Sequence, residues 1–338
     1  MDRLGNTQTA DATPLSNCDA LARLTGTRRV LIKHENQRSL GNFKSLGGVA
    51  AGLKAIAAYR ATHGERDPLA APPVRLLCAS DGNHGLAVAT AAQRAGAAAR
   101  VYLPRSVSGW RVERIARRKV EFVRVEGSYD EAVRQAHAAA DRGEGILVAD
   151  TADELADPSV QHVMAGYQVV TEEVIAQAAA LDAVPTHFFV QAGVGGLAAS
   201  VATVLHANGL QAARIVTVEP AAAGCVAAAL RAGHPVQIAG DLESCADMLS
   251  CGLASAPALE ILLGCRVDGL LVSEPELQDA PALLHRLDGT ATTPSGAAGL
   301  AGLMHASAAP SLCRTLRLDR ESVVVLFVTE GAANLAAD

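Results

Sequence analysis

The sequence predicts an α/β protein of two domains, each built on a twisted, parallel-rich sheet flanked by helices. Short apolar runs rich in β-branched residues alternate with alanine-rich segments, as expected for parallel strands joined by crossover helices. Of the 338 residues, 50% are hydrophobic, 19% are charged and 3% are aromatic, which favours close packing on small side chains. The length favours about two domains.

The alternation forms two series along the chain. In the first, we expect strands at residues 74–78, 99–103 and 122–125, each followed by a helix, at residues 85–95, 112–117 and 130–139. In the second, a strand at 186–191 precedes a helix at 196–208, and a strand at 214–218 precedes a helical segment at 221–232. Residues 322–328 are almost all Val, Leu and Phe, which is typical of a central parallel strand.

These elements predict a small domain at residues 48–161 and a large domain at residues 1–47 plus 162–338. Linkers are expected at residues 62–73 and 155–159, which contain clusters of Pro, Gly and Asp. Residues 233–281 have no regular pattern, which is typical of a long loop that covers a site.

Composition and charge exclude several classes of protein. A net charge of −6, from 29 basic and 35 acidic residues, argues against nucleic-acid binding. The basic run at residues 111–119 is interpreted as a solvated helix face. No apolar run reaches the ~18 residues of a membrane span, and the polar first fifteen residues lack a signal-peptide core. Seven cysteines without a CxxC pair favour a reducing compartment, so we expect a cytoplasmic protein with no membrane partner and no metal site.

A glycine-rich segment follows the strand predicted at 186–191. Residues 193–198, Gly-Val-Gly-Gly-Leu-Ala, satisfy the GxGxx(G/A) pattern at the start of a helix, where backbone N–H groups can bind a phosphate. Glu219, at the end of the next strand, lies near where a ribose-binding acid is expected, which leaves a nicotinamide cofactor open. The other alternative is a tight turn that packs a helix on a strand.

Two more segments could carry chemistry. Lys44 follows a Gly-Asn turn and precedes a helix expected to start near Gly48, so the helix terminus and apolar neighbours would lower the pKa of its amine. The alternative is an ordinary surface lysine. Residues 80–85, Ser-Asp-Gly-Asn-His-Gly, join a strand to a helix and offer N–H groups to a carboxylate. His84 there is either catalytic or holds the loop.

Together, Gly41-Asn42-Phe43-Lys44, residues 80–85 and residues 193–197 resemble the motifs of pyridoxal-phosphate enzymes of the tryptophan-synthase-β and threonine-dehydratase type, known as fold type II. The resemblance extends over residues 31–334. Motifs at 148–151, 164–167, 218–220 and 328–331 resemble those of the diaminopropionate ammonia-lyases in particular.

The resemblance implies a lyase that uses pyridoxal 5′-phosphate and forms a homodimer. Its reaction would be α,β-elimination of 2,3-diaminopropionate to pyruvate and two ammonia. The alternatives are a dehydratase or β-eliminase acting on serine, threonine or another β-substituted amino acid, and a ligand-binding relative without activity. Asp81 stands where the dehydratases have a second serine, which gives this loop an acid that they lack.

The resemblance also implies roles for individual residues. Catalytic roles are implied for Lys44, which would form a Schiff base with the cofactor, and for Asp81 and Asp150. Cofactor contacts are implied for Lys44, Phe43, Asn83 (ring 3′-oxygen), Gly193, Val194, Gly195, Gly196 and Leu197 (phosphate), and Thr329 (pyridine nitrogen). Substrate contacts are implied for Ser80, Asp81, Gly82 and His84.

Two alternatives stay open at this point. Asp150 either acts in catalysis, where a carboxylate can keep a leaving amine protonated, or caps the end of a strand. Cys225 and Cys251 lie in segments that resemble loops at the family's active-site entrance, so they either form a disulfide or are two thiols.

Overall fold

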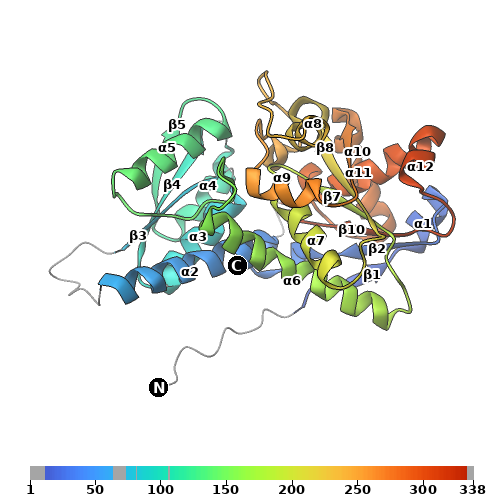
Figure 1. Ribbon diagram of the computed structural model, residues 1–338, viewed down its shortest axis with the longest axis horizontal. Coiled ribbons are helices and arrows are strands. Elements are labelled where there is room, and N and C mark those ends of the chain that lie inside the picture. The colour runs from blue at the N-terminus through green and yellow to red at the C-terminus, as the bar shows by residue number, and fades with distance from the viewer. Residues whose placement is uncertain (1–11, 64–73, 81, 106, 333–338) are drawn as a thin grey trace.

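The computed structural model describes residues 12–63, 74–80, 82–105 and 107–332, which form two sheets (Figure 1). The smaller sheet has the strand order β5-β4-β3-β6, and all its pairings are parallel. The larger sheet has the order β1-β2-β10-β7-β8-β9, in which β1 alone runs antiparallel to its neighbour. The predicted α/β class with parallel-rich sheets is confirmed.

The smaller sheet and its helices follow the first predicted series. The strands are β3 (Arg75–Ala79), β4 (Ala98–Pro104), β5 (Glu121–Val125) and β6 (Ile146–Leu147), and the helices are α3 (Asn83–Arg94), α4 (Gly109–Ala116) and α5 (Tyr129–Asp141). Each strand that the sequence predicts here is present within two residues of its expected bounds. The short strand β6 carries too few apolar residues to be predicted from its pattern.

The larger sheet collects strands from both ends of the chain. They are β1 (Leu15–Asn17), β2 (Arg29–Lys33), β7 (His187–Gln191), β8 (Arg214–Pro220), β9 (Val267–Val272) and β10 (Val323–Phe327). Its helices are α1 (Asp19–Thr25), α7 (Gly196–Ala207), α8 (Cys225–Ala232), α9 (Ala256–Leu263), α10 (Glu274–Asp288), α11 (Pro294–Ala308) and α12 (Pro310–Leu316). As predicted, β10 is central, and its residues are fully apolar and buried because both faces of the sheet are covered.

Two long helices run between the sheets along one side of the molecule (Figure 1). They are α2 (Lys44–His63) and α6 (Pro158–Ala180), and they pack against each other and against α3 and α7. Their crossing needs glycine, because a Cβ atom at Gly166 would lie 2.6 Å from the Cα atom of Gly47. This close approach fixes the start of α2, where Lys44 lies.

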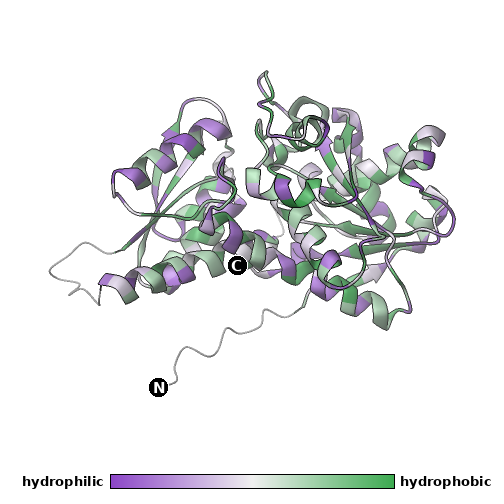
Figure 2. Cartoon of the chain, viewed as in Figure 1, coloured by the Kyte–Doolittle hydropathy of each residue, from purple (hydrophilic) through white to green (hydrophobic). Residues whose placement is uncertain are grey.

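Small aliphatic residues fill the two hydrophobic cores of the described chain. In Figure 2 the strands of the larger sheet are mainly hydrophobic, while polar residues lie on the outer faces of the helices. Many of the fully buried residues are alanines of α3, α5, α7 and α11. The low aromatic content therefore gives helices that lie close to the sheets.

Several expectations were wrong. Residues 233–281 contain α9, β9 and most of α10 instead of one long loop, because α9 is only eight residues long and β9 mixes polar and apolar residues. The linker expected at 155–159 is confined to residues 155–157, because α6 begins at Pro158, with Asp157 accepting a hydrogen bond from the Val160 N–H at 2.9 Å. The other expected linker lies largely outside the described residues. Helix α2 begins at Lys44 and not near Gly48.

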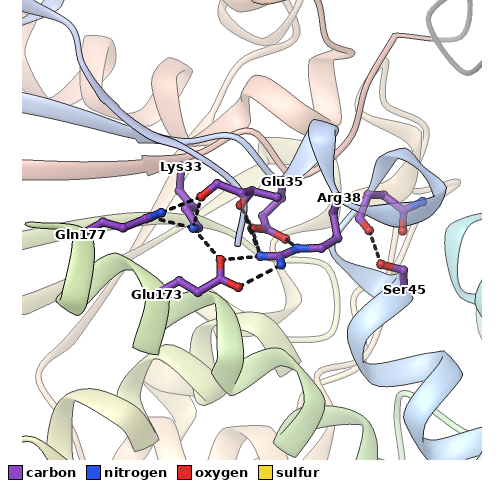
Figure 3. A network of polar contacts seen from close by, with 8 residues as sticks. Lys33, Glu35, Arg38, Ser45, Glu173 and Gln177 are labelled. Atoms are coloured by element: carbon purple, nitrogen blue, oxygen red, sulfur yellow. Dashed lines mark hydrogen bonds and ion pairs between the residues drawn. The ribbon is translucent and has the colours of Figure 1, made fainter. Parts of the chain in front are cut away.

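A buried network of charged groups fastens α6 to the segment that leads into α2 (Figure 3). The guanidinium of Arg38 donates to both carboxylate oxygens of Glu35, at 2.7 and 2.9 Å, and to both of Glu173, at 2.6 and 2.9 Å. Lys33 Nζ lies 2.6 Å from Glu173 Oε2 and donates to Gln177 Oε1 at 2.9 Å. Two cations and two carboxylates thus balance inside the protein, where isolated charges would be costly.

Two further observations bear on the sequence expectations. Within the described ranges, no helix has both the length and the apolar character needed to cross a membrane. No disulfide joins Cys225 to Cys251, which are both present as thiols.

Candidate active site

A cavity lies between the two sheets, beside the carboxyl ends of β3, β7 and β10. Ligands of open α/β sheets commonly bind at such strand ends. The structure brings together at this cavity every described residue for which a role was implied: Phe43, Lys44, Ser80, Gly82, Asn83, His84, Asp150, Gly193, Val194, Gly195, Gly196, Leu197 and Thr329. Asp81 lies outside the described residues.

Lys44 and Asp150 form an ion pair in this cavity. Lys44 Nζ donates to Asp150 Oδ2 at 2.6 Å, and the Tyr129 hydroxyl donates to Asp150 Oδ1 at 2.7 Å. Asp150 is only 6% exposed. Both carboxylate oxygens therefore have a donor, and one of them faces the lysine amine.

The electrostatics of this pair contradict the lowered pKa expected for Lys44. Burial opposes the charge on Lys44, but the Asp150 carboxylate outweighs it and raises the pKa of the amine above its usual value. Burial likewise opposes the charge on Asp150, yet His84, Lys44 and the hydrogen bonds from Lys44 and Tyr129 hold its pKa well below the usual range. Without a bound ligand, the proton is on Lys44 Nζ.

His84 holds the loop that carries it. Its Nε2 lies 2.8 Å from the Val148 carbonyl oxygen, which can only accept, so Nε2 carries the hydrogen. Burial lowers the pKa of His84 despite the nearby Asp150, so the neutral ring turns the lone pair of Nδ1 toward Asp150 Oδ2, 3.9 Å away. Ser80 shapes the same loop, because its hydroxyl oxygen accepts from the N–H groups of Gly82 and Gly85, both at 2.8 Å.

The glycine-rich segment forms an uncapped helix start. Gly195, with φ of +97°, is the residue before α7, and no side chain caps the helix. A Cβ atom at Gly193 would lie 3.1 Å from the sulfur of Cys251, so a side chain there would fill the turn. The N–H groups of the first turn of α7 therefore lack acceptors from a capping side chain and face the cavity, as a phosphate requires.

Thr329 is oriented by a residue to which sequence reasoning gave no role. Gln191, the last residue of β7, has its Nε2 within hydrogen-bond distance of three acceptors that share its two hydrogens, namely Thr329 Oγ1 at 2.9 Å and the carbonyl oxygens of Gly296 and Phe327 at 3.0 and 2.9 Å. Since Thr329 Oγ1 accepts from Gln191, its own hydrogen is available for an acceptor in the cavity. A pyridine nitrogen is such an acceptor.

Glu330 binds residues of both sheets. Its carboxylate accepts hydrogen bonds from the Asn83 side-chain amide and from the Thr293 hydroxyl, and it is only 5% exposed. The guanidinium of Arg111 lies 3.7 Å away and also pairs with Asp247. Because Glu330 can only accept, Asn83 must present its NH₂ group, which keeps a second hydrogen for a ligand oxygen.

The position of Arg111 corrects the interpretation of residues 111–119 as a solvated face. Arg111 is only 5% exposed, Arg114 donates to the Leu40 carbonyl oxygen at 2.8 Å, and Arg118 donates to the Thr90 hydroxyl at 2.7 Å. These arginines fasten α4 to the segment before Lys44 and to α3. A run of charge in the sequence does not reveal such partners, since they lie far away along the chain.

Glu219 is a helix cap and not a ribose ligand. Its two carboxylate oxygens accept from the N–H groups of Val226 and Ala227 at the start of α8, at 2.7 and 2.8 Å. Burial raises the pKa of Glu219 to about 8, against the effect of these two donors. Both oxygens are occupied, which removes the observation that favoured a nicotinamide cofactor.

The cavity residues to which sequence reasoning gave no role include Tyr129, Tyr167, Gln191 and Glu330. Gln191 could have been found, because it is a polar residue between the apolar run Phe188-Phe189-Val190 and the glycine-rich segment. Glu330 and Tyr167 belong to recognised motifs but had no assigned role. Nothing in the sequence connects Tyr129 with Lys44, since their contact with Asp150 depends on the packing of α5 beside β6.

Comparisons with known proteins agree on one family. The model of the family "Pyridoxal-phosphate dependent enzyme" matches residues 7–330. The diaminopropionate ammonia-lyase of Salmonella typhimurium is 32% identical, over 94% of this chain and 85% of that protein. The biosynthetic L-threonine dehydratase of Corynebacterium glutamicum is 27% identical, over 97% of this chain and 71% of that protein.

A solved structure is also similar over most of its length. The crystal structure of diaminopropionate ammonia-lyase from Escherichia coli, in complex with an aminoacrylate-PLP azomethine reaction intermediate, has a TM-score of 0.85 and 29% identity. The match covers 97% of this chain and 86% of that one.

Proposed function

Because this chain belongs to the family of pyridoxal-phosphate-dependent enzymes, we propose that it is a lyase that converts 2,3-diaminopropionate to pyruvate and two ammonia. The observation that carries the proposal is the buried Asp150 carboxylate, 2.6 Å from Lys44 Nζ at the centre of the cavity. Elimination of an amine needs a group that holds a proton near the leaving nitrogen, and an ion-paired carboxylate and amine can do so.

The residues of the cavity fit pyridoxal phosphate. The first turn of α7 offers N–H groups for its phosphate, Thr329 offers a hydroxyl for its pyridine nitrogen, and Lys44 offers the amine for its aldehyde. Within the described ranges, no cluster of His, Cys, Asp and Glu could hold a metal ion. When bound, this cofactor supplies an electron sink for the negative charge that develops on the substrate Cα.

In the proposed mechanism, side chains of the cavity anchor the cofactor, exchange a proton and orient one another. Lys44 anchors the cofactor, and its Nζ exchanges a proton with Asp150 Oδ2 across 2.6 Å. Tyr129 holds Asp150 through Oδ1, so that Oδ2 faces the lysine. Thr329, whose oxygen is held by Gln191, donates its hydrogen and leaves a pyridine nitrogen uncharged, which suits elimination better than a carboxylate would.

The loop of residues 80–84 is the proposed seat of the substrate carboxylate. Ser80, Gly82, Asn83 and His84 line the cavity on the side of the smaller sheet, while Thr329 and the glycine-rich segment line it on the side of the larger one. We therefore propose that residues 48–161, and residues 1–47 plus 162–338, are two domains that hold substrate and cofactor between them. Asp81 would be the second carboxylate near the reacting atoms.

Product stoichiometry tests this function. We expect the purified enzyme, assayed on a panel of D- and L-amino acids, to release two ammonia per pyruvate from 2,3-diaminopropionate. Serine or threonine as the better substrate, with one ammonia per keto acid, would favour the dehydratase alternative, with which the relationship to threonine dehydratases is compatible. Absence of keto acid from every amino acid in the panel would contradict both and leave a ligand-binding relative.

A single substitution tests the role of Asp150. Asp150→Asn is expected to lower kcat by about 10²–10⁴-fold, as for loss of a general acid or base. It also removes the negative charge that raises the pKa of Lys44, so in the cofactor-free protein the pKa of Lys44 should fall. The measurement is the pH dependence of Lys44 modification by an amine-specific reagent, read by peptide mass spectrometry.

Lys54 provides an internal reference for that titration, because it lies on the exposed side of the same helix. Its modification should have the same pH dependence in both proteins. If the Lys44 profile also stayed unchanged, the Asp150 charge would not control the lysine and the proposed proton exchange would be wrong.

We extend the proposal to a homodimer, as the resemblance implies, located in the cytoplasm, as the cysteine usage predicts. Light scattering of the purified holoenzyme would measure the mass of a dimer, whereas the mass of a single chain would contradict it.

A further inference from the structure

The hydroxyl of Tyr167 lies at the cavity but has no role in the proposed mechanism. Tyr167 of α6 is only 3% exposed and lines the cavity, yet its hydroxyl has no hydrogen-bond partner among the described residues. A buried hydroxyl without a partner is costly, by about 1–3 kcal/mol in typical proteins. Such a group indicates that a bound ligand is its hydrogen-bond partner.

The ring places this hydroxyl next to the start of α7. Cε1 and Cε2 are the two ring carbons bonded to the hydroxyl-bearing carbon. Cε1 lies 2.5 Å from the position that a Cβ atom would take at Gly47, and Cε2 lies 3.9 Å from the position that one would take at Gly196. Gly196 is the first residue of α7. The hydroxyl end of Tyr167 is thus located between the first turn of α2 and the uncapped N-terminus of α7.

Tyr167 has little freedom to turn elsewhere. The crossing of α2 and α6 at Gly47 and Gly166 fixes its backbone, and the Phe43 ring packs against its ring with centroids 4.8 Å apart. In addition, Ser200 of α7 donates to the Met164 carbonyl oxygen of α6 at 2.9 Å, which ties the two helices together just before Tyr167. The orientation of the hydroxyl is therefore built into the packing of three helices.

The two unsatisfied features complement one ligand. The α7 N-terminus supplies backbone N–H donors and a partial positive charge, and the Tyr167 O–H is a further donor beside them. Glycine at positions 195 and 196 keeps side chains from shielding these donors. An oxyanion with several oxygens would accept from all of them and match the partial positive charge, a neutral acceptor would lack that charge, and a cationic group would accept from none.

We propose that the Tyr167 hydroxyl is a ligand of the cofactor's 5′-phosphate and completes, from α6, a site whose other donors come from residues 193–197. This inference rests on the proposed function, since it requires that pyridoxal phosphate binds here. Tyr167 is a binding residue in this assignment and has no part in proton transfer. The assignment also explains why the hydroxyl of Tyr167, and not only its apolar ring, is buried.

The test compares two ligands that differ only in the phosphate. The full-length chain is freed of cofactor, and its affinities for pyridoxal 5′-phosphate and for pyridoxal are measured by equilibrium dialysis. In Tyr167→Phe, the affinity for pyridoxal 5′-phosphate is expected to fall about ten- to hundredfold, as for loss of a hydrogen bond to a charged group, while the affinity for pyridoxal stays the same.

Tyr129→Phe is the matched control, because it removes a hydroxyl from the same cavity that donates to Asp150 and not to the phosphate. In Tyr129→Phe, the ratio of the affinity for pyridoxal 5′-phosphate to the affinity for pyridoxal should be the same as in the wild type. An unchanged ratio in Tyr167→Phe would overturn the inference while leaving the proposed function intact. Failure of the wild-type chain to bind either ligand would overturn both.

A second measurement separates ligand binding from a structural role. Because the Tyr167 hydroxyl has no partner among the described residues, cofactor-free Tyr167→Phe should unfold in urea at the same or a higher midpoint than the wild type. A lower midpoint would show that the hydroxyl bonds within the protein, and this too would contradict the assignment.

Discussion

Lys44→Ala is expected to abolish turnover, with kcat reduced by at least about 10³-fold, and to remove all covalent attachment of the cofactor. Under the proposed function the side-chain amine of Lys44 would be the nucleophile that anchors the cofactor, and within the described chain no other lysine lines the cavity. Attachment is measured by borohydride reduction of the holoenzyme followed by mass spectrometry, in which the peptide that contains Lys44 should gain the mass of the reduced cofactor.

Lys54→Ala is the matched control for this prediction. Lys54 lies ten residues further along α2 and is exposed, so its loss removes the same charge from the same helix without touching the cavity. We expect kcat and labelling of Lys44 to be unchanged in Lys54→Ala. Labelling of any other lysine in the wild-type enzyme would show that Lys44 is not the anchor. Circular dichroism of each variant would verify that the fold is retained.

Arg38→Ala is expected to lower the free energy of unfolding by about 3–5 kcal/mol, the usual effect of breaking a buried ion pair. The Arg38 side chain is 1% exposed and the Glu35 side chain is 0% exposed. Without the guanidinium, Glu35 would keep, from the part of the chain that the structure describes, only the side-chain hydrogen bond from the Thr13 hydroxyl, at 2.6 Å, while Glu173 would still have Lys33. The measurement is urea unfolding of the cofactor-free protein, with the same denaturant dependence in both variants.

Arg320→Ala is the surface counterpart. The side chain of Arg320 is 91% exposed and lies 3.8 Å from Glu321, an arrangement that typically contributes less than about 1 kcal/mol. Equal effects of Arg38→Ala and Arg320→Ala would mean that water reaches Glu35 once the arginine is gone. The contribution of the network in Figure 3 would then be far smaller than its burial suggests.

The network also links stability to the active site. Arg38 lies six residues before Lys44, and its ion pairs join that segment to Glu173 of α6, the helix that carries Tyr167. Arg38→Ala therefore removes ion pairs outside the cavity. These ion pairs hold α6, which carries Tyr167, against the segment that leads into α2, which carries Lys44. Sequence reasoning gave Arg38 no role, because its partner Glu173 is 135 residues away.

Regular repetition made much of the fold predictable. Strand β10 is a continuous apolar run, and the alternation of strands with alanine-rich helices is a local property that can be read from neighbouring residues. The region around β9 was missed because its strand mixes polar and apolar residues at a partly exposed edge of the sheet. Short or edge elements acquire their structure from the neighbours they pair with, and these neighbours are distant along the chain.

The sequence by itself determined the family, the α/β class and the segments that meet at the cavity, because glycine-rich turns and the residues next to Lys44 have local requirements. Only the tertiary structure decided the electrostatics and the partners. It made Lys44 a protonated amine instead of one with a lowered pKa, since Asp150 comes from 106 residues away. It also turned Glu219 into a helix cap, buried Arg111 and left the Tyr167 hydroxyl without a partner among the described residues, because burial and distance depend on how helices and sheets pack.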